Sequence, residues 1–186
     1  MTDLHVWKHG WADVYAHRNC DIAADFLSMV VVPSIRALEQ RKEQLSAHED
    51  AAIAAFGVQD HSVLMGKTNT AFCLSIQSLF EQQIRGYLIT CADSLKIKTV
   101  TTHDLEHRSW GPKFDALFFE VRGLRLTDFD SYERLTYLQQ LGNVCRHGDG
   151  VSCRQLYIDH PELWPNDTLA VPPSRRSFSS IVVPEA

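Results

Sequence analysis

The stretch SVLMGKTNTAFCLSIQSLFEQQIRGYLITCADSL, residues 62–95, decides the fold class of this chain. Its apolar residues recur at steps of three and four, at Phe72, Ile76, Leu79, Phe80, Ile84, Leu88, Cys91 and Leu95. That spacing marks one face of an α-helix, which turns once in about 3.6 residues. Glu81 and Arg85 lie one turn apart, and their opposite charges predict an ion pair on the exposed side. The stretch therefore predicts a long amphipathic helix.

The segments before this helix also have a helical pattern. Residues 21–49 are apolar early and charged late, and Pro33 predicts either a kink or the first turn of a second helix. The stretch AAIAAFGVQDHS, residues 51–62, predicts a short Ala-rich helix, and Gly57 is expected to end it. Nearer the N-terminus, aromatic residues one turn apart predict a packed stripe, at Trp7, Trp11 and Tyr15.

The segments after it are shorter. Residues 96–110 are polar and predict a loop with a short turn, whereas Gly111-Pro112 predicts the start of a helix. Residues 127–147 predict the last long helix, which ends in Arg and His before Gly148. SCRQLYIDH, residues 152–160, predicts a brief final helix.

No strand pattern is strong enough to propose a sheet, so the expected fold class is all-α, a bundle of about four or five helices. We expect a single helical domain over residues 1–169. A Pro/Ser-rich C-terminal tail is expected over residues 170–186.

The composition is that of an ordinary globular protein, with 45% hydrophobic and 22% charged residues. The net charge of −5 argues against a protein that coats nucleic acid with a broad basic surface. Five scattered cysteines are expected to be reduced core thiols. The N-terminus lacks a signal core, and the longest apolar run, FLSMVVVP, is too short to span a bilayer. The sequence predicts a soluble cytoplasmic protein without a membrane partner.

The last long helix has a polar face that carries no charge until Arg146. An uncharged polar face suits a surface that is partly covered and hydrogen-bonded. Asn143 and His147 lie one turn apart on this face, so the amide can orient the imidazole. Two interpretations stay open: His147 is a functional group, or it caps an ordinary helix.

The string LGNVCRHGDGVSCRQLYIDHPELW, residues 141–164, resembles the closing segment of small bacterial proteins of the HEPN superfamily. SLFEQQIRGYL, residues 78–88, is similar to their long core helix. The resemblance implies a helical bundle that forms a homodimer. It also implies a metal-independent RNA endonuclease of a defence or toxin–antitoxin system, with a partner protein and no cofactor.

The resemblance assigns acid/base catalysis to His147 and its orientation to Asn143. Gly142 stands where the family has its arginine, so Arg146 becomes the catalytic phosphate contact. Arg154 and Gln140 are the further candidates for binding substrate. Because Gly142 departs from the family pattern, a catalytically inactive interaction or regulatory subunit is the alternative function.

Metal chemistry is a third expectation, of lower rank. In HDLEH, His103 and His107 are four residues apart, as a metal-dependent hydrolase would need on a helix, although the segment is expected to be a loop. Four zinc-capable side chains also lie close together in the sequence, at Cys145, His147, Cys153 and His160, without a familiar zinc spacing. No metal is assigned to the site.

Overall fold

In a computed structural model the chain folds almost entirely into helices. The structure describes residues 10–148 and 150–163, and the expected tail at 170–186 lies outside them. These two ranges contain no strand, so the all-α prediction is confirmed. None of their helices combines the length and the apolar character that a membrane crossing requires.

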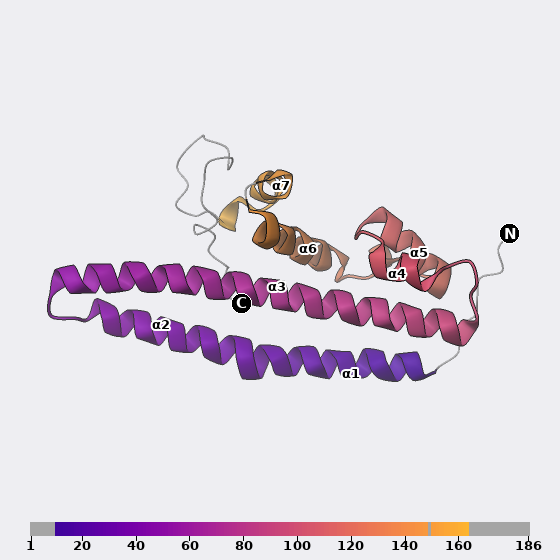
Figure 1. The fold of residues 1–186 in the computed structure, drawn as a ribbon, viewed down its shortest axis with the longest axis horizontal. Coiled ribbons are helices and arrows are strands. Elements are labelled where there is room, and N and C mark those ends of the chain that lie inside the picture. Colours follow the sequence, from indigo (N-terminus) through magenta and orange to yellow (C-terminus); the bar gives the residue numbers. More distant parts are fainter. Residues whose placement is uncertain (1–9, 149, 164–186) are drawn as a thin grey trace. The chain divides into compact units, whose positions relative to one another are not determined.

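The helices follow one another with short connections (Figure 1). The described elements are α1 (Trp11–Phe26), a π-helical turn (Leu27–Val31), α2 (Val32–Ser46), α3 (Ala51–Leu95), α4 (Thr102–His107), α5 (Pro112–Arg122), a 3₁₀ turn (Leu126–Asp128), α6 (Tyr132–His147), α7 (Val151–Asp159) and a final 3₁₀ turn (Pro161–Leu163).

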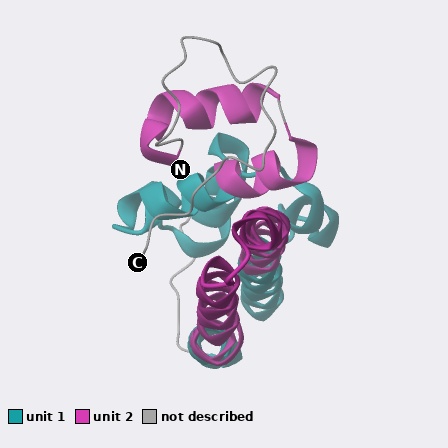
Figure 2. Ribbon diagram, turned by 90° about the vertical axis from the view of Figure 1, so that its left-hand side faces the viewer, with its two compact units in different colours: residues 1–23, 77–139 teal, residues 24–76, 140–186 magenta. Residues whose placement is uncertain are grey.

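The chain divides into two compact units (Figure 2). The first unit comprises residues 1–23 and 77–139, and the second comprises residues 24–76 and 140–186. The long helix α3 therefore gives its first part to the second unit and its last part to the first. The expectation of a single domain over 1–169 stays a prediction.

The first unit has a conventional hydrophobic core. It is formed by residues of α1, α3, α4 and α5: Ala12, Leu88, Cys91, Ala92, Leu105, Phe114, Phe118 and Val121, with Ile97, Val100 and Leu126 from the connections. Most of the α3 residues come from the apolar face that the periodicity predicted. Burial raises the pKa of the Cys91 thiol to about 11, which suits a reduced core cysteine.

Arg85 ties α4 to α3 in this unit. Its Nη1 and Nη2 donate to the carbonyl oxygens of Leu105 (2.6 Å) and Arg108 (2.9 Å). Its guanidinium also lies over the ring of Phe114, 4.9 Å from the centroid. The predicted ion pair with Glu81 is therefore wrong, because tertiary contacts use the guanidinium instead.

The expectation of a loop over 96–110 is wrong for residues 102–107, which form α4. Thr101 caps this helix by accepting a hydrogen bond from the backbone N–H of Asp104 (3.1 Å). The hydrogen bond from the Thr101 hydroxyl lowers the pKa of the Asp104 carboxyl, and the guanidinium of Arg108, one turn later, lowers it further. Leu105 is buried in the core and anchors the helix.

The second unit begins with a hairpin of α2 and the first part of α3. Asp50 caps α3 by accepting from the backbone N–H groups of Ala52 (2.8 Å) and Ile53 (3.1 Å). The buried ring of His61 donates from Nε2 to the carbonyl oxygen of Leu38 in α2 (2.7 Å). The two helices are thus fastened near their middles.

Gly57 does not end a helix, contrary to the expectation. A Cβ atom at this position would lie 3.2 Å from Cδ2 of Leu45, so the glycine allows α2 to approach α3 closely. The helix continues through it from Ala51 to Leu95. Pro33 lies in the first turn of α2, which confirms one of the two expectations for this residue.

Two further boundaries differ from the sequence patterns. The first helix begins at Trp11 rather than at residue 21. Of the expected aromatic stripe, Trp7 lies outside the described residues, and the expectation of packing is wrong for Trp11, which is 76% exposed. The last long helix begins at Tyr132 rather than at residue 127, because Leu126–Asp128 form a 3₁₀ turn. There the buried carboxylate of Asp115 accepts from the backbone N–H of Leu126 (2.7 Å).

Candidate functional site

The predicted site residues lie at the end of α6 and the beginning of α7, all within the second unit. Arg146 and His147 are exposed, and Asn143 is half-buried. Among the residues that the structure describes, neither Asn143 nor His147 forms a side-chain hydrogen bond. The expected orientation of the imidazole by the amide is therefore not seen.

The end of α6 is closed by backbone rather than by the histidine ring. Gly148 adopts a left-handed conformation (φ 64°), and its N–H donates to the carbonyl oxygen of Val144 (2.8 Å). The imidazole of His147 is left exposed to solvent. The helix end therefore does not need the His147 ring as a cap, and the functional interpretation of His147 stays a prediction.

Gln140 forms a hydrogen bond within the site, whereas Arg154 is exposed to solvent. The Nε2 of Gln140 donates to one carboxylate oxygen of Asp159 (3.3 Å), and Gln155 donates to the other (2.9 Å). Gln140 thus helps to hold α7 on α6. Arg154 is exposed in the first part of α7. We call the end of α6 and the beginning of α7, residues 143–154, the α6–α7 elbow; its exposed guanidinium groups are those of Arg146 and Arg154.

Gly142 is buried and, as a glycine, provides no guanidinium at the position where the HEPN resemblance expects an arginine. What the elbow offers chemically is one exposed imidazole and two exposed guanidinium groups. An imidazole can move a proton on a ribose hydroxyl, and guanidinium groups can bind phosphate oxygens.

The two neighbouring cysteines form a thiol pair rather than a metal site. The thiol of Cys145 donates to the sulfur of Cys73 in α3, which lowers the pKa of Cys73 and raises that of Cys145. Cys153 is buried. Residues 10–148 and 150–163 hold no cluster of three or more His, Cys, Asp or Glu side chains that could bind a metal, so the four zinc-capable side chains noted in the sequence do not come together.

His103 and His107 lie on α4, with their rings stacked at a centroid distance of 4.3 Å. The Nδ1 of His107 donates to the carbonyl oxygen of His103 (3.1 Å), which leaves its Nε2 free. Two imidazoles are fewer than the three protein ligands of a typical catalytic zinc site. Within the described part of the chain, no further His, Cys, Asp or Glu side chain joins these two to form the metal site that the lower-ranked hydrolase alternative needs.

Sequence reasoning missed a buried amide network in the first unit. Gln77 and Gln139 are both buried, and the Nε2 of Gln77 donates to Oε1 of Gln139 (2.8 Å). The Nε2 of Gln139 donates to Oε1 of Glu81 (2.7 Å). The uncharged polar face of α6 is thus partly a structural surface. The unusual lack of Lys and Glu on that face was its only sequence signal.

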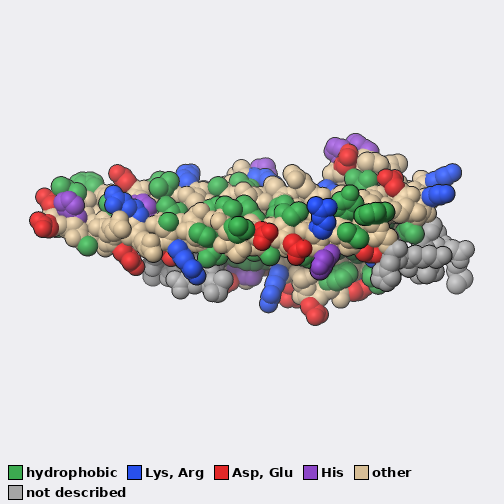
Figure 3. All heavy atoms as spheres, turned by 90° about the horizontal axis from the view of Figure 1, so that it is seen from below, with side chains coloured by type: hydrophobic (Ala, Val, Ile, Leu, Met, Phe, Trp, Pro, Cys, Tyr) green, Lys and Arg blue, Asp and Glu red, His purple; other side chains and the backbone are tan. Residues whose placement is uncertain are grey.

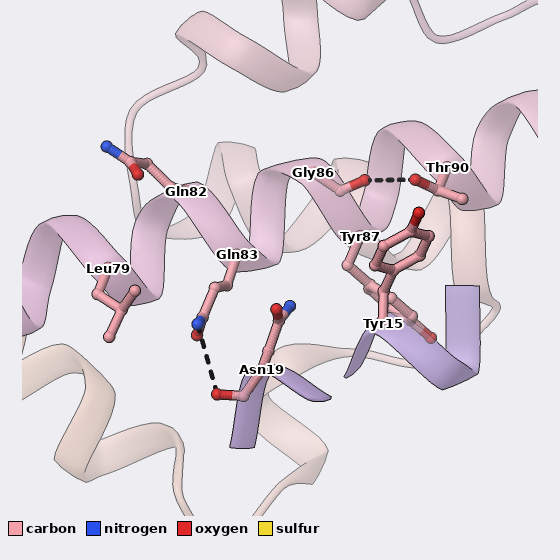
Figure 4. A pocket seen from close by; sticks show the side chains of 8 residues that line it. All are labelled: Tyr15, Asn19, Leu79, Gln82, Gln83, Gly86, Tyr87 and Thr90. Carbon is pink, nitrogen blue, oxygen red and sulfur yellow. Dashed lines mark hydrogen bonds between the residues drawn. The ribbon is translucent and has the colours of Figure 1, made fainter. Parts of the chain in front are cut away.

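A shallow groove of about 320 Å³ lies between α1 and α3 in the same unit (Figure 4). Tyr15 of α1 and Tyr87 of α3 extend toward each other's helix, and Gln83 donates to the carbonyl oxygen of Asn19 (3.4 Å). Its lining contains no charged side chain. Burial raises the pKa of the Tyr87 hydroxyl.

The first part of α3 carries an exposed apolar surface. Four large apolar side chains there are exposed, between 48% and 74%: Ile53, Phe56, Val63 and Leu64. In the π-helical turn Met29 is also 73% exposed. Figure 3 shows hydrophobic side chains that lie at the surface among acidic and basic ones.

The comparisons with known proteins add no relative. No protein-family model, curated protein or solved structure matches the chain. The HEPN resemblance therefore stays a prediction, and the function has to be argued from the geometry.

Proposed function

We propose that this chain is a helical interaction module that works by associating with a second copy of itself. The non-catalytic alternative that the sequence raised is an interaction or regulatory subunit, and self-association is a specific form of it. A helix stabilised by tertiary packing normally turns its apolar side chains toward a core, and large exposed apolar patches mark interaction surfaces. The observation that carries the proposal is the exposure of Ile53, Phe56, Val63 and Leu64 on α3.

The hairpin around these residues supports the proposal. The helix α2 contains no fully buried residue, and in the first part of α3, residues 51–76, only His61 is buried. Burying a side chain the size of Phe or Leu contributes about 1.5 to 3 kcal/mol. Within one chain these apolar side chains stay exposed and contribute little. A second surface that covers them would bury them and stabilise the hairpin.

Replacing Phe56 by Ser tests the proposal. Because Phe56 is 74% exposed in the single chain, the substitution leaves the fold intact and removes a contact made only between copies. We expect the thermal unfolding midpoint of the wild-type protein to rise with protein concentration, and that of Phe56→Ser to be lower and independent of concentration.

The matched control is Phe129→Ser, at an exposed phenylalanine of the first unit. It should keep the concentration dependence of the wild type. A wild-type midpoint that is the same from micromolar to millimolar protein would contradict the proposal.

RNA cleavage at the α6–α7 elbow is a second candidate function. It is favoured by the imidazole of His147, which is exposed and forms no hydrogen bond with the described residues. General acid/base catalysis by a histidine contributes about 10²- to 10⁴-fold to a rate. Cleavage of a labelled single-stranded RNA in EDTA should therefore fall at least about 100-fold in His147→Ala. His17→Ala, at another exposed histidine, is the control. Equal cleavage by wild type and His147→Ala would exclude this role.

A further inference from the structure

The first part of α3 has three sides, and the described residues of its unit cover two of them. Gly57 and His61 face α2, through Leu45 and Leu38. Cys73 faces α6, through Cys145. The third side is the exposed one.

We define the α3 stripe by the residues on this third side. At about 100° per residue, they fall within an arc of about 100° and extend along about 30 Å of helix. The stripe consists of Ile53, Phe56, Asp60, Val63, Leu64, Lys67, Ala71 and Leu74. All are exposed except Leu74, which is half-buried.

Two charges interrupt the stripe. Asp60 lies between Phe56 and Leu64, and Lys67 lies between Val63 and Ala71, each one turn from its neighbours. Neither charge forms an ion pair or a side-chain hydrogen bond within the described part of the chain. A surface that covers the stripe must therefore provide a base for Asp60, an acid for Lys67 and apolar side chains for the rest.

The stripe is complementary to itself when reversed. Residues at equal distances from the midpoint between Val63 and Leu64 complement each other in polarity, size or charge. The matching pairs are Val63 with Leu64, Asp60 with Lys67, Phe56 with Ala71, and Ile53 with Leu74. The first and last pairs are apolar, the second is acid with base, and the third is large with small.

We propose that α3 packs antiparallel against α3 of a second copy, with a two-fold axis between Val63 and Leu64. A two-fold interface uses the same surface on both chains, so each pair of residues occurs twice, once on either side of the axis. Asp60 of each chain then pairs with Lys67 of the other, and Phe56 packs over Ala71. This inference rests on the proposed function and adds the orientation and the register in which the second copy binds.

The charges also disfavour a parallel pair of α3 helices in register. In a parallel pair in register, Asp60 would face Asp60 and Lys67 would face Lys67 across the axis. Like charges opposed in an interface destabilise it and are a common means of rejecting a wrong pairing. The order of charges along the stripe therefore favours the antiparallel dimer.

Charge reversal in the full chain tests the register. Asp60→Lys leaves two bases in each stripe and Lys67→Asp leaves two acids, so each variant alone should dimerise at least tenfold more weakly. An equimolar mixture of the two should form heterodimers, because every cross-chain pair is again acid with base. The double variant, Asp60→Lys with Lys67→Asp, should regain the homodimer. Native mass spectrometry distinguishes these species by mass.

The controls are Glu39→Lys and Lys42→Asp, exposed charges of α2 with the same changes in net charge. They should dimerise as the wild type does, and circular dichroism should show the helix content of every variant unchanged. A wild-type dimer whose reversal variants still dimerise, or whose mixture forms no heterodimer, overturns the register and leaves the proposed self-association intact. A monomeric wild type overturns both.

Discussion

Arg85 shows how tertiary contacts override a local pattern at the scale of one residue. Its spacing from Glu81 predicted a surface ion pair, which in an isolated helix is worth only about 0.2 to 0.5 kcal/mol. In the folded chain each side chain bonds elsewhere, Arg85 to the carbonyl groups of α4 and Glu81 to Gln77 and Gln139. Hydrogen bonds of charged groups to buried partners are stronger than that local term. The sequence pattern contains no information about which distant carbonyl oxygens need a donor.

Removal of this guanidinium should destabilise the protein substantially. Arg85→Ala leaves the carbonyl oxygens of Leu105 and Arg108 without their donor and should lower the free energy of unfolding by about 2 to 4 kcal/mol. Arg85→Lys should cost about half as much, because an ammonium group keeps the charge but not the two-pronged geometry. Urea denaturation measures both.

The exposed Arg36 on α2 provides the matched control. Arg36→Ala should change the free energy of unfolding by less than about 0.5 kcal/mol, as surface substitutions usually do. An equal effect at both positions would show that the Arg85 contacts do not stabilise the fold.

The same limit applies to the candidate site. The site residues that the sequence singled out around the α6–α7 elbow stay a prediction, whereas the partly covered polar face expected on α6 agrees with the burial of Gln139. It could not show that Gln139 is buried against Gln77, because those residues are far apart in the chain. Nor could it show that Gly148 closes the helix and leaves His147 exposed.

At the scale of elements, periodicity predicted the long helices well and their ends poorly. Apolar spacing identified the second part of α3 correctly. Gly57 was expected to end a helix, but a glycine inside a helix costs only about 1 kcal/mol, which packing against Leu45 and the Asp50 cap outweigh. The helix α4 was missed because it has only six residues, and contacts from Arg85 and the core hold it in place.

The two glycines of the first part of α3 should respond differently to alanine. A Cβ at Gly66 meets nothing within 4 Å, so Gly66→Ala should stabilise the protein by about 0.5 to 1 kcal/mol through helix propensity. At Gly57 the new methyl group meets Leu45 at 3.2 Å, so Gly57→Ala should gain less. Thermal or urea unfolding of both variants measures the difference. A larger gain at Gly57 than at Gly66 would contradict the close approach of α2 to α3.

At the scale of the whole molecule, the account turns on how many chains associate. The HEPN resemblance implied a homodimer but did not identify the surface that forms it. The α3 stripe was present in the sequence as a spacing of Ile53, Phe56 and Val63, yet a core helix can show the same spacing. The exposure of these side chains in the folded chain distinguishes an interaction surface from a core.

Sedimentation equilibrium of the full chain tests the central claim most directly. The account predicts that the wild-type protein sediments at twice the chain mass of 21.1 kDa, and that Phe56→Ser sediments at the mass of one chain. Both proteins should have the same helix content. A wild-type mass of one chain at every concentration, or a Phe56→Ser variant as dimeric as the wild type, would contradict the account.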